Sequence, residues 1–234
     1  MKIWFVSWKN LALWIACIIA ALVILGFLLF SPPKLTPVME PIYAGPAGKQ
    51  AVTLMINVDW GEDVLPGILD ELSKNQVPVT FFVTGQFVRK HPELVAAMDS
   101  GGHEIANHGY SHSHPDRLTL EENQEEITRT QAEIEGLGLT AARLFAPAYG
   151  EKKPHVALAA EGLGYRTVYW TIDTLDWQEP SPEEICRRIE TRLEDGALIL
   201  AHPKECTLQA LPRVIALVKA ADYQFLTVSQ MLDL

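Results

Sequence analysis

The sequence predicts an α/β fold in which parallel strands form a small, distorted barrel with helices on its outside. Between residues 50 and 234, short apolar stretches alternate with amphipathic stretches of helical period. This alternation is typical of a parallel sheet that is covered by helices. About seven such units in roughly 185 residues favour a barrel over an open sheet, and in a barrel the functional side chains gather where the strands end.

Each element of this fold has its own signal in the sequence. Short apolar runs predict strands at Ala51–Val58, Val79–Val83, Glu104–Ala106, Leu144–Ala146, Thr167–Ile172, Ala197–Ala201 and Gln224–Thr227. Amphipathic patterns predict helices at Val64–Lys74, Pro92–Ser100, Leu120–Glu135, Lys153–Glu161, Pro182–Leu193 and Leu208–Ala220. Two of the helix starts carry the pattern of a capping box, at Thr119-x-x-Glu122 and at Ser181-x-x-Glu184.

Three segments precede the domain at residues 50–234. Residues 11–30 carry no charge, and a helix of about 20 apolar residues is long enough to cross a bilayer. Lys2 and Lys9 precede this stretch and predict that residues 1–10 are cytoplasmic. No small-x-small cleavage site follows, so we expect an uncleaved signal anchor. Residues 31–49 contain five prolines and predict an extended linker.

The charge of the outer domain limits its partners. Without Lys2 and Lys9, 19 − 2 = 17 basic side chains stand against 29 acidic ones, which gives a net charge of −12. This charge argues against nucleic acid or anionic lipid as the partner. Cys186 and Cys206 belong to no motif, and we interpret them as isolated thiols, with a disulfide between them as the alternative.

The first predicted strand ends in a polar stretch. Its apolar residues are followed by N-V-D-W-G-E-D, residues 57–63. A buried strand that ends in this way delivers polar side chains to a site. Asn57 stands at the end of the strand, and its amide cannot accept a proton. Asp59 is two residues further on, so in an extended chain it points to the same side as Asn57.

Three histidines fall within the seven residues from His108 to His114. Neutral imidazoles this close together are frequent metal ligands. His108 and His112 are four residues apart, so a helical turn would place them on one face, whereas the spacing of His112 and His114 suits a strand. We therefore prefer a metal site to the alternative of a polar surface loop.

Two further strands end in residues that can move protons. Asp173 follows the apolar run near Trp170, and Asp176 and Trp177 come next. An acid at this position can orient a histidine or a substrate hydroxyl, with an Asx turn as the alternative. His202 ends the run A-L-I-L-A and is a general acid–base candidate, with a backbone-bonded histidine at the barrel rim as the alternative.

One more stretch, L-F-A-P-A-Y-G at residues 144–150, combines apolar side chains with a single hydroxyl. Pro147 and Tyr149 would form an apolar wall beside a site. Composition alone favours a plain turn here.

Taken in order, these stretches resemble the polysaccharide deacetylase family, also called NodB-homology domains or family 4 carbohydrate esterases. The resemblance covers about residues 50–232 and includes GGHEIANHGYSH, GYRTVYWTIDTLDW and GALILAH. It implies a distorted (β/α) barrel that removes acetyl groups from N-acetylated glycans such as peptidoglycan or chitin. It also implies a divalent metal, which in many members is zinc.

The resemblance assigns roles to individual residues. His108 and His112 match the two histidine ligands of the metal, and His202 matches the histidine that protonates the leaving amine. The other matches form the substrate-binding wall and the acidic and aromatic motif: Pro147, Tyr149, Asp173, Asp176 and Trp177.

The first family motif, T-F-D-D, is altered in this chain. Without gaps it falls on residues 55–58, so the aspartate that acts as base becomes Asn57 and the aspartate that binds metal becomes Val58. A gapped alignment sets Asp59 on the base and Trp60 on the ligand, but it breaks the spacing. Asp59 can serve as a displaced base or third ligand only if the chain bends back after it.

The wall motif, R-P-P-Y in the family, has Ala146 in place of its arginine. An arginine there would lose its acidic partner when residue 57 is an amide, and an unpaired buried charge costs several kcal/mol. The two changes therefore fit together as one redesigned site.

The resemblance implies a metal-dependent hydrolase of N-acetyl groups on a cell-wall glycan. Because Asn57 cannot accept a proton, we expect weak or lost activity, since a general base contributes about 10²–10⁴-fold. The alternatives are a non-catalytic, membrane-tethered glycan-binding protein and a hydrolase for another small acyl group. We expect a single-pass protein of the cell membrane with the C-terminal domain on the extracytoplasmic side.

Overall fold

The computed structural model describes residues 8–29 and 40–234. The chain divides into two compact units, Met1–Val38 and Met39–Leu234. The first unit contains helix α1 (Trp8–Leu29). Among the residues that the structure describes, no helix combines the length and apolar character needed to cross a membrane. Residues 1–7 and 30–39, which carry parts of the expected cytoplasmic segment, span and linker, lie outside the described residues.

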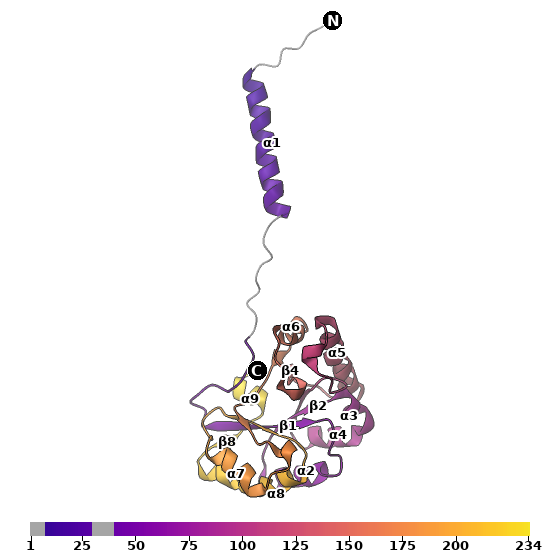
Figure 1. The fold of residues 1–234 in the computed structure, drawn as a ribbon, viewed down its shortest axis with the longest axis vertical. Helices are drawn as coiled ribbons and strands as arrows, with labels where there is room; N and C mark the ends of the chain where they lie inside the picture. Colours follow the sequence, from indigo (N-terminus) through magenta and orange to yellow (C-terminus); the bar gives the residue numbers. More distant parts are fainter. Residues whose placement is uncertain (1–7, 30–39) are drawn as a thin grey trace. The chain divides into compact units, whose positions relative to one another are not determined.

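A curled parallel sheet forms the centre of the second unit (Figure 1). The order of its strands is β5-β4-β3-β2-β1-β7-β6, and β8 pairs with the start of β1. Within the described residues β5 and β6 end this order, so the curl is a half-barrel, and the predicted α/β fold is confirmed in this form. The strands are β1 (Ala51–Val58), β2 (Thr80–Val83), β3 (Glu104–Asn107), β4 (Leu144–Phe145), β5 (Arg166–Thr167), β6 (Ile172–Asp173), β7 (Leu198–Ala201) and β8 (Gln224–Phe225).

Helices α2 to α8 cover the outer face of the sheet, whereas α9 contributes Val228 to the cluster that contains Met55 and Phe82. The helices are α2 (Leu65–Asn75), α3 (Gly85–Lys90), α4 (Pro92–Ser100), α5 (Leu120–Gly136), α6 (Pro154–Gly162), α7 (Pro182–Glu190), α8 (Glu205–Ala220) and α9 (Val228–Leu232). Short 3₁₀ turns are η1 (Pro115–Arg117), η2 (Ala148–Gly150) and η3 (Asp176–Gln178). The sequence did not predict α3 and α9, because both are shorter than two helical turns and their apolar period is too brief to read.

The two predicted capping boxes have different outcomes. At α5 the Thr119 side chain and the Glu122 side chain each bind the other's backbone N–H, as predicted. At α7 the Ser181 hydroxyl accepts the N–H of Glu184. The Glu184 carboxylate instead pairs with Arg187 one turn later, so this cap is one-sided.

The predicted strand Thr167–Ile172 is wrong as one element, because it splits into β5 and β6. Between them Val168 forms a β-bridge with Ile42, and the Tyr169 N–H donates to the Ile42 carbonyl at 2.7 Å. Ile42 is buried at 6% exposure. Residues 40–49, predicted as linker, therefore pack with the domain, because backbone pairing at Ile42 holds a segment whose prolines gave it a linker-like sequence.

Side chains of β1 alternate between two cores. Ile56 and Val58 belong to the larger core cluster, which lies between the sheet and helices α2, α4, α7 and α8. Met55 belongs to a smaller cluster with Phe82, inside the curl of the sheet. Because side chains alternate along a strand, Asn57 shares the inner face with Met55. The last residues of β1 are thus divided, with Asn57 inside the curl and Val58 in the outer core.

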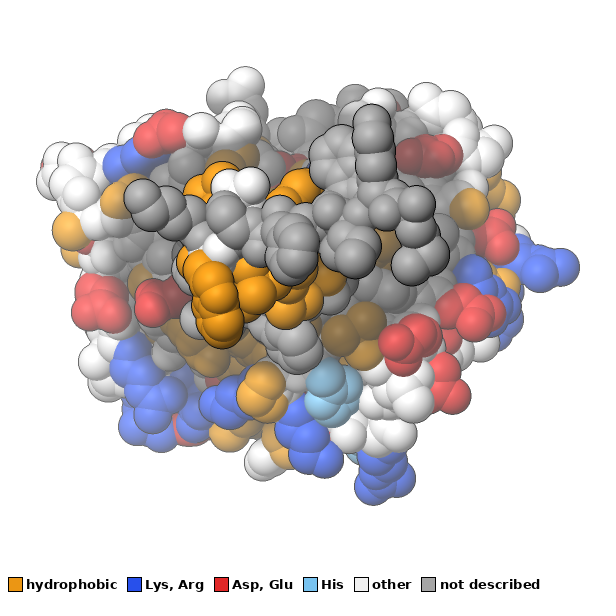
Figure 2. Space-filling model, turned by 90° about the horizontal axis from the view of Figure 1, so that it is seen from above, with side chains coloured by type: hydrophobic (Ala, Val, Ile, Leu, Met, Phe, Trp, Pro, Cys, Tyr) orange, Lys and Arg blue, Asp and Glu red, His pale blue; other side chains and the backbone are white. Residues whose placement is uncertain are grey.

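The surface carries charges of both signs. On the face seen in Figure 2, acidic and basic side chains both lie around the margin, and Lys and Arg side chains gather at its lower left. The exclusion of nucleic acid as a partner stays a prediction of the sequence.

Candidate active site

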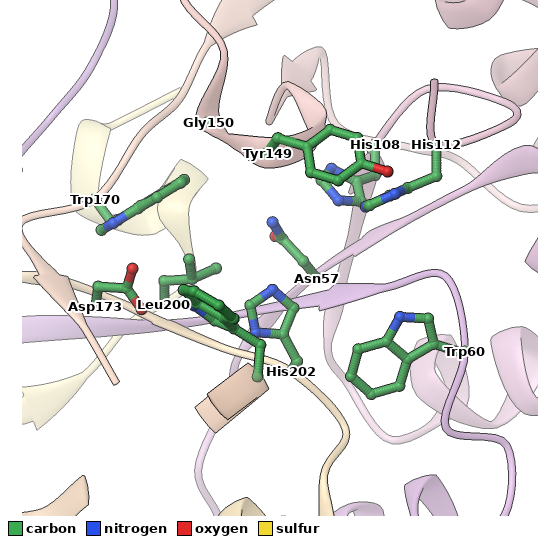
Figure 3. A pocket seen from close by; sticks show the side chains of 11 residues that line it. Asn57, Trp60, His108, His112, Tyr149, Gly150, Trp170, Asp173, Leu200 and His202 are labelled. Atoms are coloured by element: carbon green, nitrogen blue, oxygen red, sulfur yellow. The ribbon is translucent and has the colours of Figure 1, made fainter. Parts of the chain in front are cut away.

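A cavity of about 430 Å³ opens where several strands of the half-barrel end. It brings together most of the predicted site residues, and Figure 3 shows their side chains around it. Three predicted residues do not line it: Asp59, Pro147 and Asp176. The lining is Asn57, Trp60, His108, His112, Tyr149, Gly150, Trp170, Asp173, Trp177, Leu200 and His202.

His202 follows β7 and is held by a buried carboxylate. Its Nδ1 lies 2.7 Å from Oδ1 of Asp176, and its backbone N–H donates to Oδ2 of the same residue at 2.6 Å. The Thr207 hydroxyl also donates to Oδ2, at 2.6 Å. Asp176 is fully buried. Because the Asp176 carboxylate can only accept a hydrogen bond, His202 Nδ1 carries the proton and donates it. The Nε2 atom of His202 then remains for a ligand.

Asp173 ends β6 and has two roles in the structure. Its Oδ1 accepts the Leu175 N–H at 2.8 Å, which is the Asx turn considered from the sequence. Its side chain also lines the cavity. The acid that orients His202 is therefore Asp176, while Asp173 is available to a ligand.

His108 and His112 lie next to each other on the loop after β3. Their ring centroids are 5.1 Å apart. His108 is 2% exposed, and its Nδ1 lies 2.6 Å from the carbonyl oxygen of Ala146. Burial lowers the pKa of His108 to about 3, with a further contribution from His112, so the imidazole is neutral at physiological pH. Burial also lowers the pKa of His112.

The helical turn considered for the two histidines is absent from this loop. His112 has a φ of 52°, in the left-handed region, and the loop between it and β3 is irregular. The loop geometry brings the two rings together, so their proximity was predicted correctly and the local structure was not.

A third metal ligand is missing from this arrangement. The Thr84 hydroxyl donates to Oδ1 of Asp59 at 2.9 Å, and Thr84 caps α3. The chain does turn after Asp59, at Gly61 with a φ of 95°, but the Asp59 carboxylate is held at the start of α3. Among the described residues no three His, Cys, Asp or Glu side chains are placed to hold a metal ion. The predicted set of His108, His112 and Asp59 is therefore not assembled, and the residues present do not make a complete metal site.

Asn57 stands at the centre of the cavity wall (Figure 3). It is 5% exposed, and its Oδ1 is buried without a hydrogen-bond partner among the described residues. A buried amide oxygen normally has a partner, so the unpaired Oδ1 is an exception among the buried polar atoms of the described residues.

Aromatic side chains border the cavity on several sides. Trp60 stacks on His202 with centroids 6.0 Å apart, and the Lys204 ammonium lies 4.7 Å from the Trp60 ring. Tyr149 lies between His112 and His114, and its ring centroid is 4.7 Å from that of His112 and 4.0 Å from that of His114. Sequence reasoning did not assign Trp60 or Trp170 to the site, although both lie within three residues of a strand end, which is the signal that marked the other site residues.

Known proteins share this architecture. The family model described as polysaccharide deacetylase matches residues 44–168. The chain belongs to the polysaccharide deacetylase family. The chain is 38% identical over 196 residues to an uncharacterized protein of Bacillus subtilis, covering 83% of this chain and 61% of that protein. It is 28% identical to a peptidoglycan-N-acetylglucosamine deacetylase of Bacillus cereus, covering 81% of this chain and 70% of that protein.

Solved structures of this family are also similar. A CE4 family pseudoenzyme from Bacillus anthracis is similar with a TM-score of 0.80 and 32% identity, over 85% of this chain and 70% of that chain. A mutant pseudoenzyme described as having restored enzymatic activity has the same TM-score at 31% identity, over 85% of this chain and 72% of that chain. This part of the family thus includes both deacetylases and a pseudoenzyme.

Proposed function

We propose that this deacetylase-like domain binds an N-acetylated cell-wall glycan in the cavity and removes acetyl groups only slowly. The observation that carries the proposal is Asn57, an amide at the strand end where the family motif has the aspartate that takes a proton from water. Loss of a general base lowers the rate by about 10²–10⁴-fold. The likeness to a pseudoenzyme structure supports the same reading.

The other half of the chemistry is retained. Asp176 fixes the His202 tautomer, so that Nε2 faces the ligand. In this position a protonated His202 would donate its Nε2 proton to the leaving nitrogen as the C–N bond breaks, while water adds its oxygen to the acetyl carbon and loses its proton to solvent. This retained pair supports slow hydrolysis over none.

Zinc is the metal that we propose for the two imidazoles, on the grounds of ligand type. With only two protein ligands among the described residues, we expect weak retention, well below one ion per chain after dialysis. Metal analysis of wild type and of His108→Ala tests this. A full equivalent of zinc in wild type, lost in His108→Ala, would show that a third ligand is recruited.

Acetate release tests the catalytic part. Chitotetraose and peptidoglycan fragments are incubated with wild type and with Asn57→Asp, with His202→Ala in each background as the matched control. We expect measurable binding by wild type and acetate release at least about 100-fold faster in Asn57→Asp. Equal rates in wild type and Asn57→Asp would contradict the role of Asn57. Binding without acetate from either would favour the non-catalytic glycan-binding alternative.

Location is a separate proposal. The uncharged stretch of residues 11–30 and the preceding lysines support anchoring to the cell membrane, with the domain on the extracytoplasmic side. Cell fractionation with protease treatment of intact protoplasts tests it. Recovery of the full chain in the soluble fraction, or protection of the domain from protease, would contradict it.

A further inference from the structure

We propose that the cavity binds a glucosamine unit with a free amino group more tightly than an N-acetylated unit, with the Asp173 carboxylate as the partner of the ammonium. This inference deepens the glycan binding proposed above and rests on it, but it does not depend on hydrolysis. It makes the domain a receptor for cell-wall glycan that has already lost acetyl groups.

Asp173 presents an uncommitted carboxylate oxygen to the cavity. Its Oδ1 accepts the Leu175 N–H at 2.8 Å. Its Oδ2 has no hydrogen-bond partner among the described residues, and it is not one of their buried unpaired atoms. The Asp173 side chain is half-buried and lines the cavity (Figure 3). A ligand in the cavity can therefore reach Oδ2 directly.

The Asp173 carboxylate has no cationic side chain paired with it. The described residues that line the cavity include no lysine and no arginine. Arg188 donates from Nε to the backbone carbonyl of Asp173, at 3.0 Å. Lys204 lies against the ring of Trp60, but its ammonium is paired with Glu179 at 2.8 Å. A cationic group on the ligand would thus supply the counter-charge that the cavity wall lacks.

The register of the sheet places His202 close to Asp173. Asp173 on β6 is the Cα partner of Leu200 on β7, and both side chains line the cavity. His202 also lines the cavity and lies two residues beyond Leu200, a step of about 6.6 Å along a strand. Because Nδ1 of His202 donates to Asp176, the neutral ring offers a lone pair at Nε2. The wall therefore holds two acceptors that a single amino sugar can contact.

An N-acetylated unit and a free amine differ in how they leave this wall. The acetamido group carries no charge, so a ligand that displaces water from Asp173 leaves the carboxylate without an opposite charge. An ammonium instead forms a charge-assisted hydrogen bond, which is about twice as strong as a neutral one. Trp170 and Trp177 also line the cavity, and indole faces attract cations. Both terms favour the free amine.

Two matched oligosaccharides test the proposal. Chitotetraose with one free amino group and fully N-acetylated chitotetraose differ by a single acetyl group. At about pH 7 most of the amine is protonated, since a comparable α-amino group has a pKa of about 7.7–8.0. Trp60, Trp170 and Trp177 line the cavity, so tryptophan fluorescence reports binding of either ligand. We expect wild type to bind the free amine at least about fivefold more tightly at low ionic strength, and less selectively in about 1 M salt.

Variants separate the charge of Asp173 from its structural role. Asp173→Asn removes the charge and keeps an oxygen for the Leu175 N–H, so the turn should be retained. We expect it to bind the two ligands within about twofold of each other, with its affinity for the N-acetylated ligand close to that of wild type. Asp99→Asn removes the same charge from an exposed position on α4 and should keep the wild-type preference. If Asp173→Asn does not fold, Asp173→Ser can still accept the Leu175 N–H and gives the same comparison.

Each outcome has a distinct meaning. Equal binding of the two ligands by wild type, or a preference that survives in Asp173→Asn, overturns this inference and leaves glycan binding intact. An equal loss of affinity for both ligands in Asp173→Asn also overturns it, because Asp173 would then bind a sugar hydroxyl. Loss of the preference in Asp99→Asn overturns it in favour of overall net charge. Failure of wild type to bind either ligand overturns the proposed function together with the inference.

Discussion

The two sides of the cavity differ in how their polar groups are satisfied. On the His202 side, the buried Asp176 carboxylate accepts three hydrogen bonds, from the His202 ring, the His202 backbone and Thr207. On the Asn57 side, the amide oxygen has no hydrogen-bond partner among the described residues. Asp59, the acidic residue that follows Asn57 most closely in the sequence, accepts a hydrogen bond from Thr84.

This difference shows which side of the cavity is held by internal hydrogen bonds and which side is not. A fully bonded buried carboxylate contributes to the fold and orients the histidine at the same time. An amide oxygen that is buried without a partner costs the folded state about 1–3 kcal/mol, because no hydrogen bond offsets its desolvation. The His202 side is thus held by its own hydrogen bonds, whereas the Asn57 side lacks such a network among the described residues.

The largest effect on the free energy of unfolding is expected for Val58→Asp, which restores the second aspartate of the family motif on the Asn57 side. Val58 is fully buried in the outer core with Ile56 and Leu65. Val58→Asp should lower the free energy of unfolding by about 4 kcal/mol, because it buries a carboxylate among apolar side chains. Urea denaturation measures this, with Val58→Thr as the control of similar volume. A stable Val58→Asp protein that gains a zinc equivalent would show that this side chain reaches the cavity.

On the His202 side, removal of the orienting acid should be the next largest effect. Asp176→Ala loses three hydrogen bonds and leaves buried donors unpaired, so the free energy of unfolding should fall by about 3 kcal/mol. Asp173→Ala, which loses the Asx turn to Leu175, should cost about 1 kcal/mol in the same denaturation experiment. Similar costs for the two variants would mean that the His202 side is not more firmly held than its surroundings.

Acid should lower the free energy of unfolding through protonation of His108, which lies on the Asn57 side of the cavity. In the unfolded chain this histidine binds a proton below about pH 6.5, whereas in the folded domain its pKa is about 3. The buried neutral His108 therefore lowers the stability of the domain only below about pH 6.5. From there the free energy of unfolding falls by about 1.4 kcal/mol per pH unit as the pH drops toward 3. His108→Asn, which retains a donor toward Ala146, should remove that part of the slope. Parallel stability curves for the two proteins between pH 6 and pH 4 would contradict the burial of a neutral imidazole.

The smallest effect is expected at the rim, where both sides meet solvent. Trp177 is 53% exposed and lines the cavity. Trp177→Ala should weaken chitotetraose binding by about threefold, or less than about 1 kcal/mol, through lost aromatic contact with the sugar. Its free energy of unfolding should stay within about 0.5 kcal/mol of wild type, as for other exposed positions. A loss of binding greater than about tenfold would place the main contact at the rim instead.

Sequence reasoning located the chemistry well and some elements poorly. It placed β1 at residues 51–58 and found that Asn57 lies at the end of this buried strand and that His202 follows another, because an apolar run that ends in polar residues is a local signal. It missed the split of Thr167–Ile172, which depends on Ile42 from far along the chain. It left open whether a helical turn or a strand brings the histidines together, since spacing cannot show the left-handed φ of His112.

By itself, the sequence determined the family, the order of strands and helices, and the residue types available to the site, because these depend on local pattern and on motif order. Only the tertiary structure decided which acids serve the cavity. Asp59 and Asp176 look equivalent in sequence, each close to a strand end, yet one is held by Thr84 and the other orients His202. The direction of a side chain beyond a strand end depends on the loops and helices that pack against it, and those contacts come from distant parts of the chain.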